Sequence, residues 1–159
     1  MTDKRACVSD AIRAAREGSV GWLIQRLAGQ LDRAMDEKLA PHGLTIQKFA
    51  VVMTVMEYDG LSQSEIGNLY RSPAYKITRS IDALEADGFL ERRAHPASRR
   101  TNTVHATPKA LKLAPTLIAI IEAVNQQMLA GLGSGEDRQV HALLRQMLER
   151  NDLSKVDPA

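Results

Sequence analysis

Two helix-start signals lie ten residues apart in the run SQSEIGNLYRSP, residues 62–73, and they limit the fold more than any other feature. Ser62 followed by Glu65 predicts a capping box, in which each side chain bonds a backbone amide at the helix start. Ser72 before Pro73 predicts a second helix at once, with serine as N-cap and proline in the first helical position. Two helices separated by so short a turn are typical of a helix-turn-helix.

The residue pattern changes at Gly88, where the second of these helices is predicted to end. Residues 89–94 and 103–106 are predicted as two short strands, joined by a loop that carries Pro96, Arg99 and Arg100. The apolar line of the second helix, which we expect to be buried, is Ile77, Ile81 and Leu84. The buried side of the first helix is predicted to be Ile66 and Leu69.

Longer amphipathic helices are predicted on both sides of this segment. Leucine and methionine recur every four residues from Leu23 to Leu39, which predicts a helix over residues 20–40. Thr45 is predicted to cap a helix with one apolar face, formed by Ile46, Phe49, Met53 and Met56. Thr107-Pro108 is predicted to open a long helix to about Leu132, and a last helix follows to about residue 150. The fold class is therefore mainly α with a small β-hairpin wing, a winged helix-turn-helix with an α-helical dimerisation region.

This pattern divides the chain into parts with different expected roles. Residues 1–18 are an N-terminal extension with a short helix over 10–17, residues 45–107 are the winged helix-turn-helix domain, and residues 152–159 are a tail. Residues 19–44 and 108–151 form a helical dimerisation region. Its helices carry more apolar surface than a small winged domain can cover, so we expect a symmetric homodimer.

Basic residues are concentrated in the middle of the chain. Residues 71–109 hold eight Lys and Arg against four Asp and Glu, whereas the formal net charge of the whole chain is only +2. Such an asymmetry indicates one anion-binding face.

The second helix of the helix-turn-helix has polar and basic residues at its beginning and acids only near its end. Tyr75, Lys76 and Arg79 point away from the apolar line, as do Ser72 and Ser80 in part. A recognition helix presents its N-terminal residues to base edges in the major groove, where arginine can bond guanine through two hydrogen bonds. Lys76 would reach a base or a phosphate, and Tyr75 a thymine methyl group or a phosphate. The alternative is a solvated helix face whose charges have no role.

The predicted hairpin carries two arginine pairs. Arg99 and Arg100 at its tip are expected to reach into a minor groove, whose negative potential attracts arginine when the groove is narrow. Arg92 and Arg93 alternate along a strand, so one is expected to meet a phosphate and the other to pair with an acid of the recognition helix. Arg93 is our candidate for the DNA contact. The alternative is internal salt bridging of Arg92 or Arg93, and less readily of Arg99, with Asp82, Glu85 or Asp87.

The runs LTIQKFAVVMTV, LSQSEIGNLY, KITRSIDALEADGFLERR and SRRTNTVHATPKA resemble the MarR family of bacterial transcription regulators, over about residues 20–150. The resemblance implies a homodimer of winged helix-turn-helix domains that binds a near-palindromic site on double-stranded DNA, with Ser62 among the contacts. Arg99 matches the family's minor-groove position. The usual wing signature Asp-Arg-Arg is here Ser98-Arg99-Arg100. The usual Leu-Thr-x-x-Gly is Ala106-Thr107-Pro108-Lys109-Ala110, which keeps the helix cap but lacks the glycine.

The resemblance also implies a repressor that releases DNA when a small aromatic acid or phenol binds, or when a cysteine is oxidised. Trp22 and Arg26, one helical turn apart, are a candidate site for an aromatic carboxylate, because the ring can stack and the guanidinium can pair. Cys7 is the single cysteine, and peroxide sensing there competes with the simpler interpretation of an uninvolved thiol.

Other classes of site are not indicated. One cysteine excludes an internal disulfide, and the four histidines show no metal-ligand spacing. We find no catalytic residue set and no phosphate-binding loop, so neither an enzyme nor a cofactor is expected. No signal peptide or membrane span is predicted, which favours the cytoplasm. One rival is a helical protein–protein adaptor whose basic hairpin binds an acidic partner, and a more remote one is an enzyme that uses the helical cleft.

Overall fold

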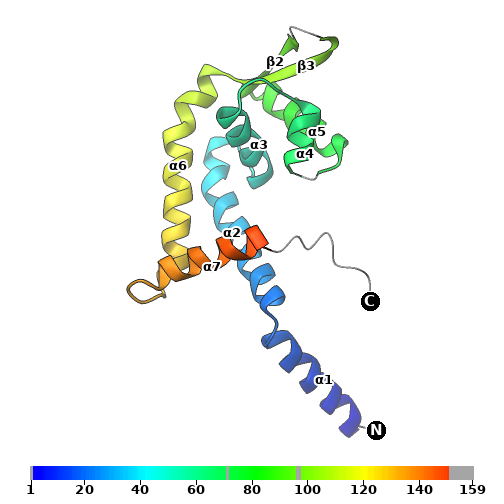
Figure 1. The fold of residues 1–159 in the computed structure, drawn as a ribbon, viewed down its shortest axis with the longest axis vertical. Coiled ribbons are helices and arrows are strands. Elements are labelled where there is room, and N and C mark those ends of the chain that lie inside the picture. The colour runs from blue at the N-terminus through cyan, green and yellow to red at the C-terminus, as the bar shows by residue number, and fades with distance from the viewer. Residues whose placement is uncertain (1, 71, 96–97, 151–159) are drawn as a thin grey trace. The chain divides into compact units, whose positions relative to one another are not determined.

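The computed structural model describes residues 2–70, 72–95 and 98–150 and consists of helices with one small sheet (Figure 1). The helices are α1 (Thr2–Glu17), α2 (Val20–Leu39), the 3₁₀ helix η1 (Ala40–His42), α3 (Ile46–Glu57), α4 (Gln63–Leu69), α5 (Ala74–Ala86), α6 (Pro108–Leu129) and α7 (Glu136–Arg150). The strands are β1 (Leu61–Ser62), β2 (Leu90–His95) and β3 (Ser98–Ala106). The predicted fold class is confirmed. The chain divides into two compact units, residues 1–124 and residues 125–159.

The first two helices meet at Gly18 and Ser19. The helix predicted over residues 10–17 is longer than expected, because α1 already begins at Thr2. Cys7 lies on this helix and is exposed. Ser19 is the N-cap of α2, and its hydroxyl accepts a hydrogen bond of 3.2 Å from the Trp22 amide. Among the described residues, no helix is long and apolar enough to cross a membrane.

Helix α3 begins with two side-chain acceptors. Thr45 caps it as predicted, because its hydroxyl accepts from the Lys48 amide at 3.3 Å. Asp36 of α2 accepts from the Ile46 amide at 2.6 Å, a cap that the sequence did not reveal. The two acceptors together fix the start of α3 to the end of α2.

The predicted single apolar face of α3 was only partly right. Phe49 is buried, but Ile46, Met53 and Met56 are only partly buried. The other buried positions are valines at 51, 52 and 55. Helix α3 contacts α2, α5 and β3, so neighbours lie on more than one side and no single stripe describes its burial.

The capping box at the start of α4 is confirmed. The Glu65 amide donates to the Ser62 hydroxyl at 3.3 Å, and the Ser62 amide donates to the Glu65 carboxylate at 2.7 Å. Ile66 is fully buried as predicted, but Leu69 is 58% exposed, which contradicts the prediction. The helix has only seven residues, and the position next to Ile66 that faces the core is Gly67. A Cβ atom at Gly67 would lie 3.8 Å from the Ile77 side chain, an ordinary contact distance, so this position lies against α5.

Helix α5 starts one residue later than predicted. Its N-cap is Pro73, which makes no side-chain cap, so the predicted capping role of Ser72 is wrong. The Ser72 amide instead donates to the Gly67 carbonyl at 3.1 Å, which closes the turn between the two helices. Ile77, Ile81 and Leu84 are buried as predicted.

The wing is an antiparallel sheet of strand order β1-β3-β2. Arg92 pairs with Val104 and Arg93 with Thr103, while β1 pairs Leu61 with Val104. Strand β1 was not predicted, because two residues are too short for a sequence pattern. Strand β3 is longer than predicted, since pairing of Ser98 with His95 extends the hairpin almost to its turn.

Arg99 and Arg100 therefore lie within β3 and not in the loop between the strands, which corrects the prediction. The predicted loop residue Pro96 lies outside the described residues. Beside α5, the hairpin of β2 and β3 can be followed in Figure 1.

The core of the first unit lies where α2, α3, α4, α5, β3 and α6 meet. Its most deeply buried side chains are Leu39, Val52, Val55, Ile66, Ile81, Leu84, Leu90, Val104, Leu117 and Val124. Thr107 caps α6 as predicted, accepting from the Ala110 amide at 3.3 Å. The helix ends at Leu129 rather than near Leu132, and both Met128 and Leu132 are 41% exposed. In α7 no residue is buried.

Candidate nucleic-acid interface

The beginning of α5 presents polar and basic side chains that have no partner in the described part of the chain. Tyr75 is 62% exposed, and Lys76 and Arg79 are exposed as well. None of the three makes a hydrogen bond or ion pair with another described residue. The local sequence explains this arrangement, because Ile77, Ile81 and Leu84 turn the opposite side of the helix into the core.

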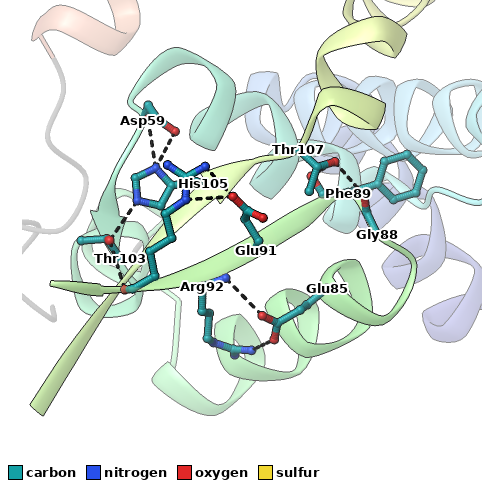
Figure 2. A network of polar contacts seen from close by, with 10 residues as sticks. Asp59, Glu85, Gly88, Phe89, Glu91, Arg92, Thr103, His105 and Thr107 are labelled. Carbon is teal, nitrogen blue, oxygen red and sulfur yellow. Dashed lines mark hydrogen bonds and ion pairs between the residues drawn. The ribbon is translucent and has the colours of Figure 1, made fainter.

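The second half of α5 is paired with the wing through one arginine. Arg92 of β2 reaches Asp82 at 2.5 Å through Nη2 and Glu85 through Nη1, and its backbone amide donates to Glu85 at 3.1 Å. Figure 2 shows Arg92 between the strand and the helix. Burial alone lowers the pKa of Arg92, but the hydrogen bonds that its guanidinium donates to Asp82 and Glu85 outweigh burial, so the pKa is raised and the guanidinium stays charged.

This pair of contacts confirms that one arginine of β2 binds acids of the recognition helix. The Arg92 side chain is only 18% exposed, so we assign it to holding the wing against α5. Arg93 faces the other side of the sheet, because neighbouring residues alternate along a strand. Its side chain is 59% exposed and pairs with Glu91 of the same strand at 2.5 Å. An exposed pair of this kind stabilises weakly and can exchange for another anion.

The C-terminal end of α5 is anchored to the helices on both sides of it in the sequence. Lys48 of α3 pairs with the Asp87 carboxylate at 2.7 Å, and Lys109 of α6 donates to the Asp87 carbonyl at 2.6 Å. The Lys109 ammonium also lies 4.3 Å from the centre of the Phe89 ring. The Thr107 hydroxyl donates to the Gly88 carbonyl at 2.7 Å. Gly88 itself has φ of 74°, a conformation that favours glycine.

The remaining predicted contacts are distributed around α5. Ser62 uses its hydroxyl to cap α4 and is half-buried, as is Ser72 in the turn. The backbones of Arg99 and Arg100 lie in β3, and their side chains are outside what the structure describes. The structure thus brings Ser72, Tyr75, Lys76 and Arg79 to one helix start.

A cavity of about 390 Å³ lies beside this helix start. It is lined by residues of α2, α3 and α5 together with the turn, namely Asp32, Ile46, Gln47, Ala50, Val51, Tyr70, Ser72, Lys76, Ile77 and Ser80. The Tyr70 hydroxyl donates to the Ala50 carbonyl at 2.7 Å and also contacts the Thr54 hydroxyl, so one wall of the cavity is fixed.

The predicted effector residues are in contact with each other. The Arg26 guanidinium lies 4.9 Å from the centre of the Trp22 ring, and the guanidinium of Arg16 lies 5.4 Å from it. Trp22 and Arg26 also line a shallow hollow along α2 with Gln25, Gly29, Gln30 and Arg33.

The residues that sequence reasoning missed form long-range polar contacts. Asp36, Lys48 and Lys109 bond other elements that lie 10, 39 and 22 residues away, and His105 bonds Asp59 46 residues away. No periodic or local signal marks such contacts, because each needs two segments that only the fold brings together. In the part of the chain that the structure describes, no group of three His, Cys, Asp or Glu side chains is arranged to hold a metal ion.

A short first helix, a second helix with an exposed basic start and a paired β-hairpin define a winged helix-turn-helix protein. Residues 44–101 match the model of the MarR family. This match agrees with the resemblance to the MarR family seen in the sequence.

Curated relatives and solved structures agree with this resemblance. An HTH-type transcriptional repressor of Mycobacterium tuberculosis is 24% identical over 133 residues, which cover 84% of this chain and 96% of the relative. The HTH-type transcriptional regulator BilQ of Clostridium symbiosum is 26% identical over 110 residues, 69% of this chain and 76% of its own.

Two solved structures have the same fold. A MarR transcriptional regulator from Methanosarcina mazei has a TM-score of 0.76 at 22% identity, over 82% of this chain and 94% of its own. A mutant of MarR from E. coli, complexed with operator DNA, has a TM-score of 0.73 at 22% identity, over 81% of this chain and 93% of its own.

Proposed function

We propose that this protein is a transcriptional regulator of the MarR type that binds double-stranded DNA in a sequence-specific manner. The observation that carries the proposal is the division of α5: Tyr75, Lys76 and Arg79 are exposed and unpaired within the described chain, whereas Asp82 and Glu85 are neutralised by Arg92. A duplex phosphate approaching the helix start would meet cations and not the helix's own acids. The operator complex of the E. coli relative supports the same use of this fold.

The proposed contacts fall into two groups. Arg79, Lys76 and Tyr75 read bases or phosphates in the major groove, with Ser62 and Ser72 donating to the backbone nearby. Arg93, Arg99 and Arg100 lie on the wing and approach the adjacent minor groove. Arg93 would exchange its exposed pair with Glu91 for a phosphate.

The active form is proposed to be a homodimer assembled through residues 19–44 and 108–151. Support comes from large apolar side chains that are exposed on α2, α6 and α7, among them Leu23 at 46%, Leu27 at 50%, Ile118 at 48% and Leu148 at 83%. A twofold axis would place two recognition helices one helical turn of DNA apart, about 34–36 Å, and make the operator near-palindromic.

We further propose that the protein is a repressor released by a small aromatic acid or phenol. Trp22 and Arg26 offer a ring and a guanidinium in contact, which suits an aromatic carboxylate. The cavity beside Lys76 is a second place for such a ligand, because an anion there would occupy a side chain proposed to bind DNA.

The test is a gel shift with the protein's own upstream region and with random duplex of equal length, at several salt concentrations. A regulator retards its own region at nanomolar to tens of nanomolar protein, and its affinity falls steeply with salt. Equal affinity for both duplexes would show that the protein binds DNA without sequence specificity, contrary to the proposal. Absence of binding to either duplex in dilute buffer would favour the adaptor, whose basic hairpin binds an acidic protein.

The effector is tested by adding hydroxybenzoates and phenols to the preformed complex. Release by one of them, abolished in Trp22→Leu and Arg26→Gln but kept in the control Lys38→Gln, supports the Trp22 site. Release that persists in both variants places the ligand elsewhere.

A further inference from the structure

The outer face of the wing sheet carries a network of polar residues around His105, which is not among the proposed DNA contacts. Strand alternation turns Leu90, Arg92 and Val104 toward α5 and the core. Glu91, Arg93, Thr103 and His105 share the opposite face, where Glu91 stands across from His105 and Arg93 across from Thr103. Figure 2 shows this face with Asp59 beside the histidine.

His105 is bonded through both ring nitrogens. Its Nδ1 lies 3.0 Å from each oxygen of the Asp59 carboxylate, and its Nε2 lies 2.9 Å from the Thr103 hydroxyl. The Thr103 hydroxyl in turn donates to the backbone carbonyl of Arg93 at 3.3 Å. The His105 side chain is only 14% exposed, and Thr103 is 7% exposed. The contacts are therefore largely shielded from water.

The positions of the hydrogens follow from the partners. A carboxylate only accepts, so Nδ1 must carry a hydrogen toward Asp59. The hydroxyl of Thr103 has a single hydrogen, which goes to the Arg93 carbonyl, so the hydroxyl accepts from Nε2 and that nitrogen must carry a hydrogen as well. All four bonds coexist only when the ring is a charged imidazolium.

This ring joins the wing to the turn between α3 and β1. The Gly60 amide donates to the Val104 carbonyl at 3.1 Å, so the turn already lies against β3. A Cβ atom at Gly60 would lie 3.3 Å from Cε1 of His105, and Gly60 has φ of 83°. The positive φ favours glycine in this turn, and a side chain there would make a tight contact with the imidazole.

We propose that His105, in its imidazolium form, is a positioning residue that holds the wing and the backbone of Arg93 in place for DNA binding. The proposal rests on the proposed function. The charged groups around the ring are Asp59 from the turn and, from β2, Glu91 with its partner Arg93; β1 contributes only Leu61 and Ser62.

Loss of the proton changes one specific contact. A neutral ring that keeps its hydrogen on Nδ1 for Asp59 presents a lone pair on Nε2. The Thr103 hydroxyl then has to turn its hydrogen toward Nε2, and the Arg93 carbonyl loses its donor. Deprotonation thereby loosens the β2 backbone at a residue proposed to contact DNA. DNA affinity is therefore expected to be higher with the protonated ring than with the neutral one.

The experiment measures the affinity of the full chain for its upstream duplex by fluorescence anisotropy from pH 5.5 to 8.5 at constant ionic strength. The wild type is expected to lose roughly 3- to 10-fold in affinity across the range, the effect of about one hydrogen bond. His105→Gln is expected to bind at pH 6 as the wild type does at pH 8, with a flat pH profile. Thr103→Val, which removes the hydroxyl but keeps the shape, is expected to flatten the profile in the same way.

Two controls separate this role from general effects of pH and of folding. Asp10→Asn, on α1 and outside both the wing and the residues proposed to form the dimer, should keep the wild-type slope. Nitrogen-15 NMR of the histidine rings at pH 6 should show N–H signals at both Nδ1 and Nε2 of His105, whether or not DNA is present.

The outcomes distinguish the two levels of inference. Specific binding with an unchanged slope in His105→Gln, or a ring with a single N–H at pH 6, overturns the role of His105 and leaves the proposed function standing. Failure of the wild type to bind any duplex overturns the proposed function, and the NMR signals still decide whether the ring is charged.

Discussion

The two ends of α5 differ in how their charged side chains are paired with the rest of the molecule. At the N-terminal end, Tyr75, Lys76 and Arg79 have no partner in the described chain, and no side chain caps the helix. At the C-terminal end, Arg92 holds Asp82 and Glu85. Asp87 is held there by Lys48 and Lys109.

The difference shows how one short helix can serve as a scaffold and as a binding surface. Acids near a phosphate backbone would repel it, but here each acid of α5 is paired with a cation of another element. The helix dipole adds a partial positive charge at the free end, where an anion is expected to bind. The ion pairs are at the C-terminal end of α5, so they leave the proposed binding surface at its N-terminal end exposed. They also fix the orientation of the helix that carries Arg79.

The largest expected effect is at the free end. Arg79→Ala should weaken specific DNA binding by roughly 1–3 kcal/mol and relax the base preference at one position, because it removes a contact to a base edge. Anisotropy with the upstream duplex and with single-base variants measures both effects. The matched control is Arg145→Ala on α7, where the arginine pairs with Glu149. If specific and random duplexes lose affinity equally, Arg79 contacts only phosphate.

At the anchored end, Arg92→Met should reduce stability as well as binding. The substitution keeps most of the apolar stem but leaves Asp82 and Glu85 unpaired beside the DNA-binding face. We expect about 1–2 kcal/mol less free energy of unfolding, a modest value because the carboxylates are 57% and 40% exposed. Urea unfolding measures the loss. Unchanged stability with a loss of affinity confined to the specific duplex would instead make Arg92 a DNA contact.

A smaller effect is expected where α3 meets α5. Lys48→Met and Asp87→Asn, singly and together, should give a coupling free energy of about 0.5–1 kcal/mol in unfolding, since the pair is partly exposed. Specific and random duplexes should be affected alike. A coupling near zero would mean that the C-terminal end of α5 is held by Lys109 and Thr107 alone.

The smallest expected effect concerns the capping box. Hydrogen bonds from the backbone amide of Ser62, and then from its side chain, lower the pKa of Glu65. A lowered pKa means that the stabilisation is complete above the usual carboxyl range and is lost as pH falls through the lowered value. The melting temperatures of the wild type and of Glu65→Gln, measured between pH 3 and 6, should therefore become more similar as the pH falls. A difference in melting temperature that grows as the pH falls would contradict a stabilising role of the Glu65 carboxylate in the capping box.

Signals that act within one helical turn could be read from the sequence. Thr45, Thr107 and the pair of Ser62 and Glu65 cap helices as predicted, because donor and acceptor lie three residues apart and meet whenever the helix forms. The burial of Ile77, Ile81 and Leu84 was also predicted correctly, because one face of α5 packs on the core and the other is exposed. The family resemblance rested on the same segment.

Predictions failed where a neighbour in space had the deciding role. Serine is a common N-cap residue, but the Ser72 amide donates a hydrogen bond to the Gly67 carbonyl, and the helix starts after Pro73. Leu69 fits the apolar pattern of α4, yet it is 58% exposed, and the position of α4 that lies against α5 is Gly67. Arg99 and Arg100 were expected in a loop, but pairing with β2 extends their strand.

The sequence by itself determined the order of helices, the wing and the group of cations that a DNA-binding face requires. Only the tertiary structure decided which charges remain available. Lys48 and Asp87 are 39 residues apart, and Asp59 and His105 are 46 apart. A hydrogen bond acts over about 3 Å, so its partners are set by where the packed core places the backbone and not by distance along the chain.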